Sequence, residues 1–449
     1  MMKKTKNGLL FALALAMMIV LTSCGGNESG SGADAPELTG TAAAAEETGA
    51  PEPSMDETEA AEPTEQEELK PEPETESDTG TETESEAEIT QPEDVQPQTY
   101  EGGVSEQAAR IVSEMTVEEK VGQMFLVRNP ASGSGSGTEA LIRQYQPGGI
   151  VMFGVDFKDD TPDGVKAKTA SYQAASALPL LIAADEEGGS VQRVGRYPQY
   201  RETPFLSPRA AYASGGLELA DAEVVERARL LKSLGLNFNL APVADVCGDA
   251  EAFIYDRSFS GDPGLASEFV GRAVDLTLSE DVACCLKHFP GYGSADDTHT
   301  GLATLSCGLD ELRACDLLPF EAGIGHGCPC VMVTHLIVEA LDRENPASVS
   351  PAVISLLRDE LGFDGVILTD DLAMGGVLDY FGGSEDPEAS GKAAVAAVLA
   401  GCDMLCCSDV GQIPAVIEAV KNGTVPQAMI DAVAGRIVQM KLSIGLMKR

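Results

Sequence analysis

From Val104 onward, the chain alternates short apolar runs with segments whose apolar residues recur every three or four positions. Helical periodicity of this kind is found, for example, in 222–234 and 268–279. Strands that are apolar throughout and separated by helices predict a parallel sheet covered on both faces. There are eight such apolar runs: QMFLV, GGIVMF, LPLLIAAD, LNFNLAPVAD, VACCLKHF, CVMVTHL, GVILTDDL and CDMLCC.

Eight buried strands alternating with helices favour an α/β fold of the closed (β/α)8 TIM-barrel type. A doubly wound open sheet is the alternative that the pattern leaves open. We expect the barrel to form a single catalytic domain over residues 103–449, after a signal peptide (1–23) and a tether (24–102).

The first 23 residues have the pattern of a bacterial export signal. Three lysines within the first six residues precede an apolar run from Gly8 to Val20, which is too short to be a good membrane span. LTSC (Leu21 to Cys24) resembles the bacterial lipobox, in which the cysteine becomes the lipid-carrying first residue. We therefore expect Cys24 to be acylated and the protein to be anchored outside the cytoplasmic membrane. A plain secretory signal is the alternative.

The tether is acidic and rich in Pro, Thr and Ser. Residues 25–101 hold 24 acids and one lysine, which accounts for −23 of the whole chain's formal net charge of −42. Such a segment cannot bury enough apolar surface to offset its ordering entropy, and we expect it to be disordered and extended. The rest of the chain is also strongly acidic, which argues against non-specific binding of nucleic acid.

The eleven cysteines sit mainly in apolar runs, as in Cys284-Cys285 and Cys406-Cys407, and this placement indicates small buried residues. Cys328 and Cys330 lie close to His326, but the cluster lacks a second half at zinc spacing. We therefore expect no metal and no cofactor. Disulfide pairing in an oxidising compartment stays open.

Ionisable residues recur where the predicted strands end. Asp185, Asp245, Lys287 with His288, His335, and Asp370 with Asp371 each close an apolar run or follow it directly. Each alone is typical of a helix cap or a loop charge. Their recurrence at the carboxyl ends of successive strands predicts a barrel active site. His326 precedes its strand and should lie at the opposite end of the barrel.

Five ordered motifs resemble glycoside hydrolase family 3, and within it the bacterial β-N-acetylglucosaminidases. They are DEEGGSVQR (185–193), NLAPVADV (239–246), DRSF (256–259), KHFPGYG with a later D-x-H (287–299), and TDDLAM (369–374). The resemblance covers Val104 to Leu446. Two departures stand out: Tyr292 occupies a position where histidine is common, and the stretch from Lys287 to His299 is about one residue short.

The resemblance implies a retaining glycosidase that removes terminal β-linked N-acetylglucosamine from cell-wall fragments or chitin oligomers. Asp370 is implied as the nucleophile, and His299 with Asp297 as the acid/base pair. Asp371 is expected to turn toward the start of the following helix, either as its cap or as a group that supports the site residues. The residues implied to hold the sugar are Asp185, Arg193, Arg257, Lys287, His288 and His335. The expected partners are this carbohydrate and the lipid anchor, and we expect a monomer.

Four other functions compete with this interpretation. A β-glucosidase of the same broad family usually takes its acid from a second domain, which we do not expect after Arg449. A metallohydrolase is disfavoured by only four histidines and no His-x-His motif. A phosphorylase using the same residues stays open. A non-catalytic glycan-binding lipoprotein is the last alternative, although Asp370, Asp297 and His299 are all intact.

Overall fold

The computed structural model describes residues 104–129, 135–293, 295, 301–383, 385–407 and 410–447. Several predictions therefore lie outside the described residues: the signal peptide, Cys24, the tether, Asp297 and His299.

The eight predicted strands form one parallel sheet. They are β1 (Phe125–Arg128), β2 (Gly149–Val151), β3 (Leu181–Ala184), β6 (Phe238–Asn239), β7 (Ala283–Phe289), β9 (Cys330–Val333), β11 (Val366–Thr369) and β12 (Leu405–Cys407). Their order is β11-β9-β7-β6-β3-β2-β1-β12.

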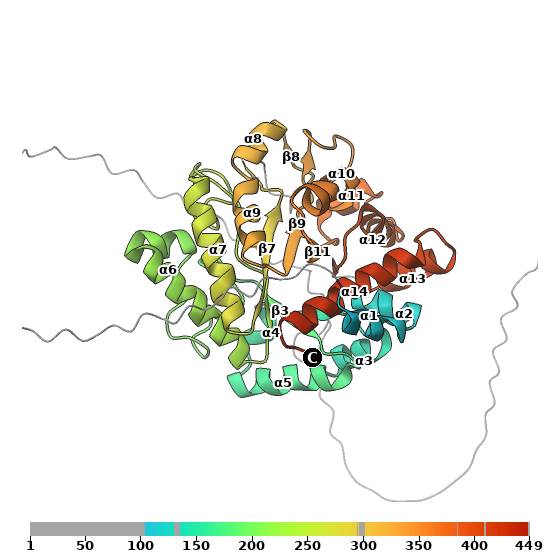
Figure 1. The fold of residues 1–449 in the computed structure, drawn as a ribbon. Coiled ribbons are helices and arrows are strands. Elements are labelled where there is room, and N and C mark those ends of the chain that lie inside the picture. The colour runs from blue at the N-terminus through green and yellow to red at the C-terminus, as the bar shows by residue number, and fades with distance from the viewer. Residues whose placement is uncertain are drawn as a thin grey trace, which may run out of the picture. The chain divides into compact units, whose positions relative to one another are not determined.

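The sheet closes because its two end strands also meet. Leu368 of β11 bridges Met404, next to β12, in parallel, and the Thr369 amide donates to the Met404 carbonyl at 3.0 Å. The prediction of a (β/α)8 barrel is thereby confirmed and the open-sheet alternative is ruled out. Figure 1 shows the helices arranged around the strands, with α6 and α7 on one side and α13 and α14 on the other.

The helices of the first half of the described chain are α1 (Glu106–Ser113), α2 (Val117–Gln123), α3 (Gly135–Tyr145), α4 (Val155–Lys158), α5 (Pro162–Ala175), α6 (Pro208–Ser233) and α7 (Pro263–Ser279). Those of the second half are α8 (Leu309–Ala314), α9 (Leu317–Gly325), α10 (Pro351–Ser355), α11 (Gly375–Tyr380), α12 (Ala389–Ala400), α13 (Gln412–Lys421) and α14 (Gln427–Ser443). A 3-10 turn (Ala347–Val349) and a π-helical turn (Leu356–Glu360) flank α10, and short strands pair outside the barrel: β4 (Glu186–Gly188) with β5 (Val191–Gln192), and β8 (Thr304–Leu305) with β10 (Ile337–Val338).

Local sequence signals start the two helices whose periodicity was most evident. The Ser207 and Asp262 side chains accept hydrogen bonds from backbone amides three residues later, and a proline follows each cap. The predicted helical segment 268–279 lies in α7. The segment 222–234 lies in the second part of α6, beyond a break at Gly215 and Gly216 whose backbone angles are not helical, and it ends at the C-cap Leu234. The Ser207 cap therefore starts only the first part of α6.

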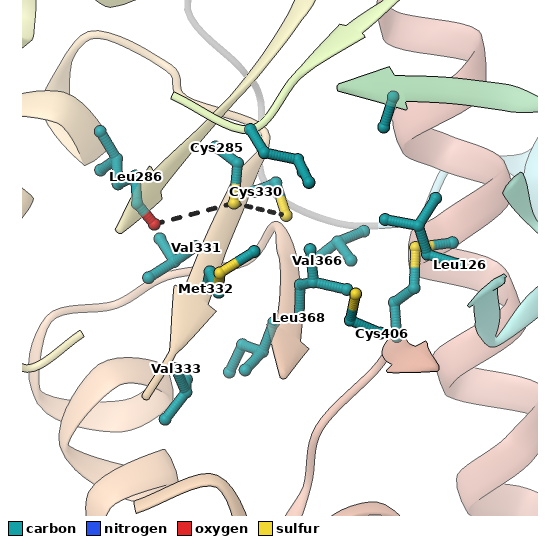
Figure 2. Packing of buried hydrophobic residues seen from close by; sticks show 14 of the residues in the cluster. Leu126, Cys285, Leu286, Cys330, Val331, Met332, Val333, Val366, Leu368 and Cys406 are labelled. Carbon is teal, nitrogen blue, oxygen red and sulfur yellow. Dashed lines mark hydrogen bonds between the residues drawn. The ribbon is translucent and has the colours of Figure 1, made fainter. Parts of the chain in front are cut away.

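The barrel interior is filled by alternate residues of the strands. Directly paired residues of a parallel sheet share a face. Following the register around the sheet places one set on the inner face: Leu126, Gly149, Leu181, Ala183, Phe238, Ala283, Cys285, Cys330, Met332, Val366, Leu368, Met404 and Cys406. In Figure 2, Cys285 and Cys330 turn toward one another from neighbouring strands. Leu286 points the other way and lies against Gly323 of α9.

The prediction that the cysteines are mainly small buried residues is confirmed for the nine that the structure describes as free thiols. Seven of these nine are buried, and Cys307 and Cys315 are partly exposed. The Sγ atoms of Cys284 and Cys328 lie 3.5 Å apart, and those of Cys285 and Cys330 lie 3.4 Å apart. His326 ends α9 ahead of β9, at the end of the barrel opposite the predicted site, as expected.

A buried lysine joins the last helix to the start of the barrel. Lys441 of α14 is fully buried, and its Nζ donates to Oε1 of Gln123 at 2.7 Å, just before β1. Burial lowers the pKa of Lys441 to about 7, and no carboxylate of the described residues pairs with it. Among the described helices, none combines the length and apolar character that crossing a membrane requires.

We predict that Lys441→Met removes a pH dependence of stability. The folded-state pKa of about 7 lies below the unfolded value, so between pH 7 and 10 only the unfolded chain holds this proton. The wild-type free energy of unfolding should therefore gain roughly 1.4 kcal/mol per pH unit over this window relative to the variant. Denaturant unfolding at several pH values measures this difference. Lys421→Met, at an exposed lysine of α13, is the control and should keep the wild-type slope. Parallel pH profiles for wild type and Lys441→Met would contradict the prediction.

Candidate active site

Charged side chains continue the inner-face columns of the barrel at the carboxyl ends of three strands. Asp185 lies two residues beyond Ala183, Lys287 two beyond Cys285, and Asp370 two beyond Leu368. Because side chains alternate along a strand, the same register that fills the core with apolar groups turns these three toward a common space. The prediction from strand ends thus has a geometric basis in residue spacing.

Lys287 is the centre of a buried ionic cluster. Its side chain is 3% exposed, and Nζ lies 2.7 Å from Oδ1 of Asp185 and 2.7 Å from Oε1 of Glu187. Burial alone would lower the pKa of Lys287, but the two carboxylates outweigh burial and raise it. The ammonium group is therefore held as a fixed cation.

Glu187 is shared between Lys287 and a second cation. Arg257 bonds it in bidentate fashion, with Nη2 2.8 Å from Oε1 and Nε 3.0 Å from Oε2. Burial of Glu187 would raise its pKa, but the charges of Lys287 and Arg257 hold that pKa well below its usual value. The pair links the loop after β6, which carries Arg257, to β4 and β7.

His288 extends the cluster to a further carboxylate. Its Nε2 lies 3.1 Å from Nη2 of Arg257, and its Nδ1 lies 2.8 Å from Oδ2 of Asp245. Asp245 is fully buried and also accepts from the His288 amide at 3.2 Å and the Tyr292 amide at 2.8 Å. This one carboxylate therefore fixes both the imidazole ring and the chain that follows β7.

Arg193 lies at the more exposed side of the cluster. Its side chain is 28% exposed, and its Nη2 lies 3.3 Å from Oδ2 of Asp185. Its guanidinium carbon stands 5.3 Å from the ring centre of Phe153, and that of Arg128 stands 4.4 Å from the same ring. Burial of Asp185 would raise its pKa, but Lys287 and Arg193 outweigh burial and lower it.

Asp370 differs from the other carboxylates because it forms no ion pair in the described part of the chain. It is partly exposed, and its Oδ1 accepts from the Asp371 amide at 2.8 Å. Burial raises its pKa, but the nearby His335 and His288 outweigh burial, so the net pKa lies below the usual value. Asp370 is thus an ionised carboxylate that leaves most of its lone pairs for an incoming group.

Asp371 and His335 support this segment. Asp371 accepts from the Ala373 amide at 2.9 Å and closes a turn ahead of α11, but the N-cap position of α11 is Met374 and no side chain of a described residue caps that helix, so the expected cap is not found. His335 is fully buried, with Nδ1 2.8 Å from Oγ of Ser348 and Nε2 3.0 Å from the Asp371 carbonyl. It was expected to contact the sugar, but the structure places both of its ring nitrogens against protein groups.

The structure brings together six of the predicted residues and adds three that had no assigned role. One network is formed by Asp185, Arg193, Arg257, Lys287 and His288. The charges of its basic members lower the pKa of the nearby Asp370. The additions are Glu187, Asp245 and the Phe153 platform. Glu187 and Asp245 could have been identified from the sequence, because they are acids at or after strand ends. Nothing in the sequence indicated the contacts of Arg128 and Arg193 with the Phe153 ring. No cluster of three or more metal-binding side chains occurs among the residues that the structure describes.

A closed parallel barrel with a cluster of charged side chains at the carboxyl ends of its strands is the architecture of a barrel enzyme. The family model described as "Glycosyl hydrolase family 3 N terminal domain" matches residues 116–440. This match covers well over half of the chain, so the chain belongs to glycosyl hydrolase family 3.

Named relatives give the same family. A β-hexosaminidase of Stenotrophomonas maltophilia is 36% identical over 296 residues, spanning 64% of this chain and 84% of that protein. The β-hexosaminidase LpqI of Mycobacterium tuberculosis is 32% identical over 353 residues, spanning 74% of this chain and 84% of that protein. Among solved structures, a family 3 β-N-acetylglucosaminidase from a Paenibacillus species superimposes with a TM-score of 0.67 at 30% identity, covering 74% of this chain and 63% of that one.

We predict that Glu187→Gln destabilises the fold strongly. The change leaves Lys287 and Arg257 with one buried carboxylate fewer, and breaking a buried ion pair costs roughly 3 kcal/mol or more. Chemical denaturation at neutral pH measures the loss. Glu118→Gln is a matched control, because Glu118 forms an ion pair with Lys421 in which both side chains are about half exposed. The control should change stability by less than about 1 kcal/mol. Similar losses of unfolding free energy for the two variants would contradict the prediction that the buried cluster depends on charge compensation by Glu187.

Proposed function

We propose that this family 3 protein removes terminal β-linked N-acetylglucosamine from glycans with retention of anomeric configuration. Asp370 is the nucleophile in this proposal, and His299 with Asp297 is the acid/base pair. The observation that carries the proposal is an ionised Asp370 that forms no ion pair with any described residue and lies near a cluster of fixed donors and acceptors. The names of the relatives, β-hexosaminidase and β-N-acetylglucosaminidase, support the choice of sugar.

The ionic network suits a neutral sugar. Sugar hydroxyls need both donors and acceptors, and Lys287, Arg193 and Arg257 supply donors while Asp185 supplies acceptors. Because these groups already pair with one another, they are held in position before the sugar arrives and lose little side-chain freedom on binding. His335 takes a different place in the proposal: it holds the main chain at Asp371 and so positions Asp370.

The proposed reaction has two steps. In the first, a carboxylate oxygen of Asp370 bonds to the anomeric carbon while the bond to the leaving oxygen breaks, and the His299 imidazolium gives that oxygen its proton. In the second, neutral His299 takes a proton from water. The water oxygen then bonds to the anomeric carbon as the bond to Asp370 breaks. The sugar leaves as the β anomer, and both side chains return to their starting states.

We also propose that the protein is held outside the cytoplasmic membrane by a lipid on Cys24. The lipobox-like LTSC and the acidic Pro-rich segment after it support this location. Cys24→Ser should release the protein from the membrane fraction or leave its precursor uncleaved, and cell fractionation with mass analysis of the N-terminus measures the outcome. A Cys24→Ser protein that stays anchored and processed like wild type would contradict acylation.

A two-substrate comparison tests the catalytic roles. Asp370→Asn should lower hydrolysis of every N-acetylglucosaminide by roughly 10⁴-fold, because no covalent intermediate can form. His299→Ala should lose about 10² to 10⁴-fold on substrates with poor leaving groups and much less in glycosylation by an activated aryl glycoside, whose oxygen needs no proton. Because the second step lacks its base, His299→Ala should accumulate glycosyl-enzyme and respond to azide.

The controls for this comparison separate the competing functions. NMR of the first product should show the β anomer, and an α anomer would make Asp370 a general base instead. Turnover that depends on added phosphate would replace hydrolysis by phosphorolysis. Wild-type protein that binds N-acetylglucosamine without turning over any glycoside would favour the non-catalytic alternative. Equal losses on both substrates with no azide response would assign His299 to binding or structure.

A further inference from the structure

Asp316 is a buried acid that the site described above does not use. It precedes α9, is 6% exposed, and its side chain makes no capping hydrogen bond to that helix. Its Oδ1 is buried without a hydrogen-bond partner, and it forms no ion pair with any basic side chain in the described part of the chain. A carboxylate in this setting would be costly, because no donor reaches Oδ1 and no cation among the described residues pairs with it; a backbone amide offsets only part of this cost.

The carboxyl group lies against the turn that follows Lys287 and His288. Gly291 approaches so closely that a Cβ added there would lie 2.8 Å from Cβ and 3.0 Å from Oδ1 of Asp316. Gly291 also has φ +117°, a backbone conformation that favours glycine, and Gly293 has φ +52° with its Cβ position 3.8 Å from the same oxygen. The fit leaves little room for water between Oδ1 and the turn.

Asp245 binds the turn from its other side. Its Oδ1 accepts the Tyr292 amide at 2.8 Å, and its Oδ2 accepts both the amide and the ring of His288. Two carboxyl groups therefore flank one short stretch of chain, and of the two it is Asp245 that has donors on both carboxylate oxygens. Burial and the charge of Asp245 both disfavour ionisation of Asp316.

We infer that Asp316 is a positioning residue for the sugar-binding residues: as a neutral acid it packs the Gly291–Gly293 turn onto Asp245, and so holds His288 in place. Loss of its proton would place a second negative charge against the turn. That charge would repel Asp245 and compete for the Tyr292 amide. This inference rests on the proposed role of His288 in holding the sugar.

The groups around Asp316 determine whether its pKa is raised or lowered. Among the described residues, the titratable groups facing it are Asp245 after β6, Glu311 on α8, and the thiols of Cys307 and Cys315 at the two ends of α8, all of them acids. Burial, and then the charge of Asp245, raise the pKa of Asp316 to about 7. Because this folded-state pKa lies above the unfolded value, the neutral form stabilises the fold at low pH, and that contribution is lost as pH rises toward 7.

The test follows binding of N-acetylglucosamine by calorimetry between pH 5.5 and 9. Wild-type affinity should fall up to tenfold per pH unit above about pH 7. Asp316→Asn, which is permanently neutral and of the same size, should keep its low-pH affinity into the alkaline range. Glu311→Gln removes an exposed neighbouring carboxylate and should keep the wild-type profile. Superimposable profiles for wild type and Asp316→Asn would overturn the inference.

A second measurement needs no variant. In wild-type protein, hydrogen exchange of the Tyr292 amide, corrected for its intrinsic pH dependence, should lose protection above about pH 7. Constant protection across that range would overturn the inference even if Asp316→Asn failed to fold. Failure of the proposed function gives a different pattern, in which no sugar binds at any pH while the Tyr292 protection still changes.

Discussion

A single buried cation organises the carboxyl end of this barrel. Lys287 is almost fully enclosed, and an ammonium group in that position is stable only if opposite charge reaches it. Asp185 and Glu187 meet this requirement from the end of β3 and from β4, while Lys287 itself comes from β7. Arg257 then balances the second charge of the pair. The need to compensate one buried charge therefore ties together segments that are about 30 to 100 residues apart in sequence.

The same network explains why one carboxylate differs from the rest. The carboxylate oxygens of Asp185, Glu187 and Asp245 all accept hydrogen bonds from cations or from backbone amides of the protein. Asp370 lies within the field of the basic side chains without being bonded to any of them in the described part of the chain. A nucleophile needs this combination, because a carboxylate that is ionised but not yet paired can still attack carbon. The surrounding pairs keep the charge of the site balanced while Asp370 stays available.

Asp245 belongs both to the ionic network and to the turn that lies against Asp316. On one side, its bonds to His288 belong to the ionic network, whose strong pairs change little over the neutral pH range. On the other, its neighbour Asp316 is an acid whose Oδ1 is buried without a hydrogen-bond donor. The turn from Gly291 to Gly293 therefore lies between a carboxylate with several donors and a carboxyl group that burial favours in its neutral form. Glycine is needed at Gly291 because Asp316 approaches its backbone.

Much of this protein could be predicted from the chain alone, because the deciding patterns are local. Apolar runs of strand length predicted all eight barrel strands, and the placement of Asp185, Lys287 and Asp370 at strand ends predicted the site. Five ordered motifs indicated the family. The partners of these residues could not be predicted in this way. Glu187 pairs with two cations, His335 contacts protein groups with both ring nitrogens, and Oδ1 of Asp316 has no donor; each of these depends on distances between segments remote in sequence. The sequence by itself therefore determined the elements and which side chains they carry to the carboxyl end. Only the closed tertiary structure decided which charges are paired, because burial and pairing are properties of the space between strands and not of any one of them.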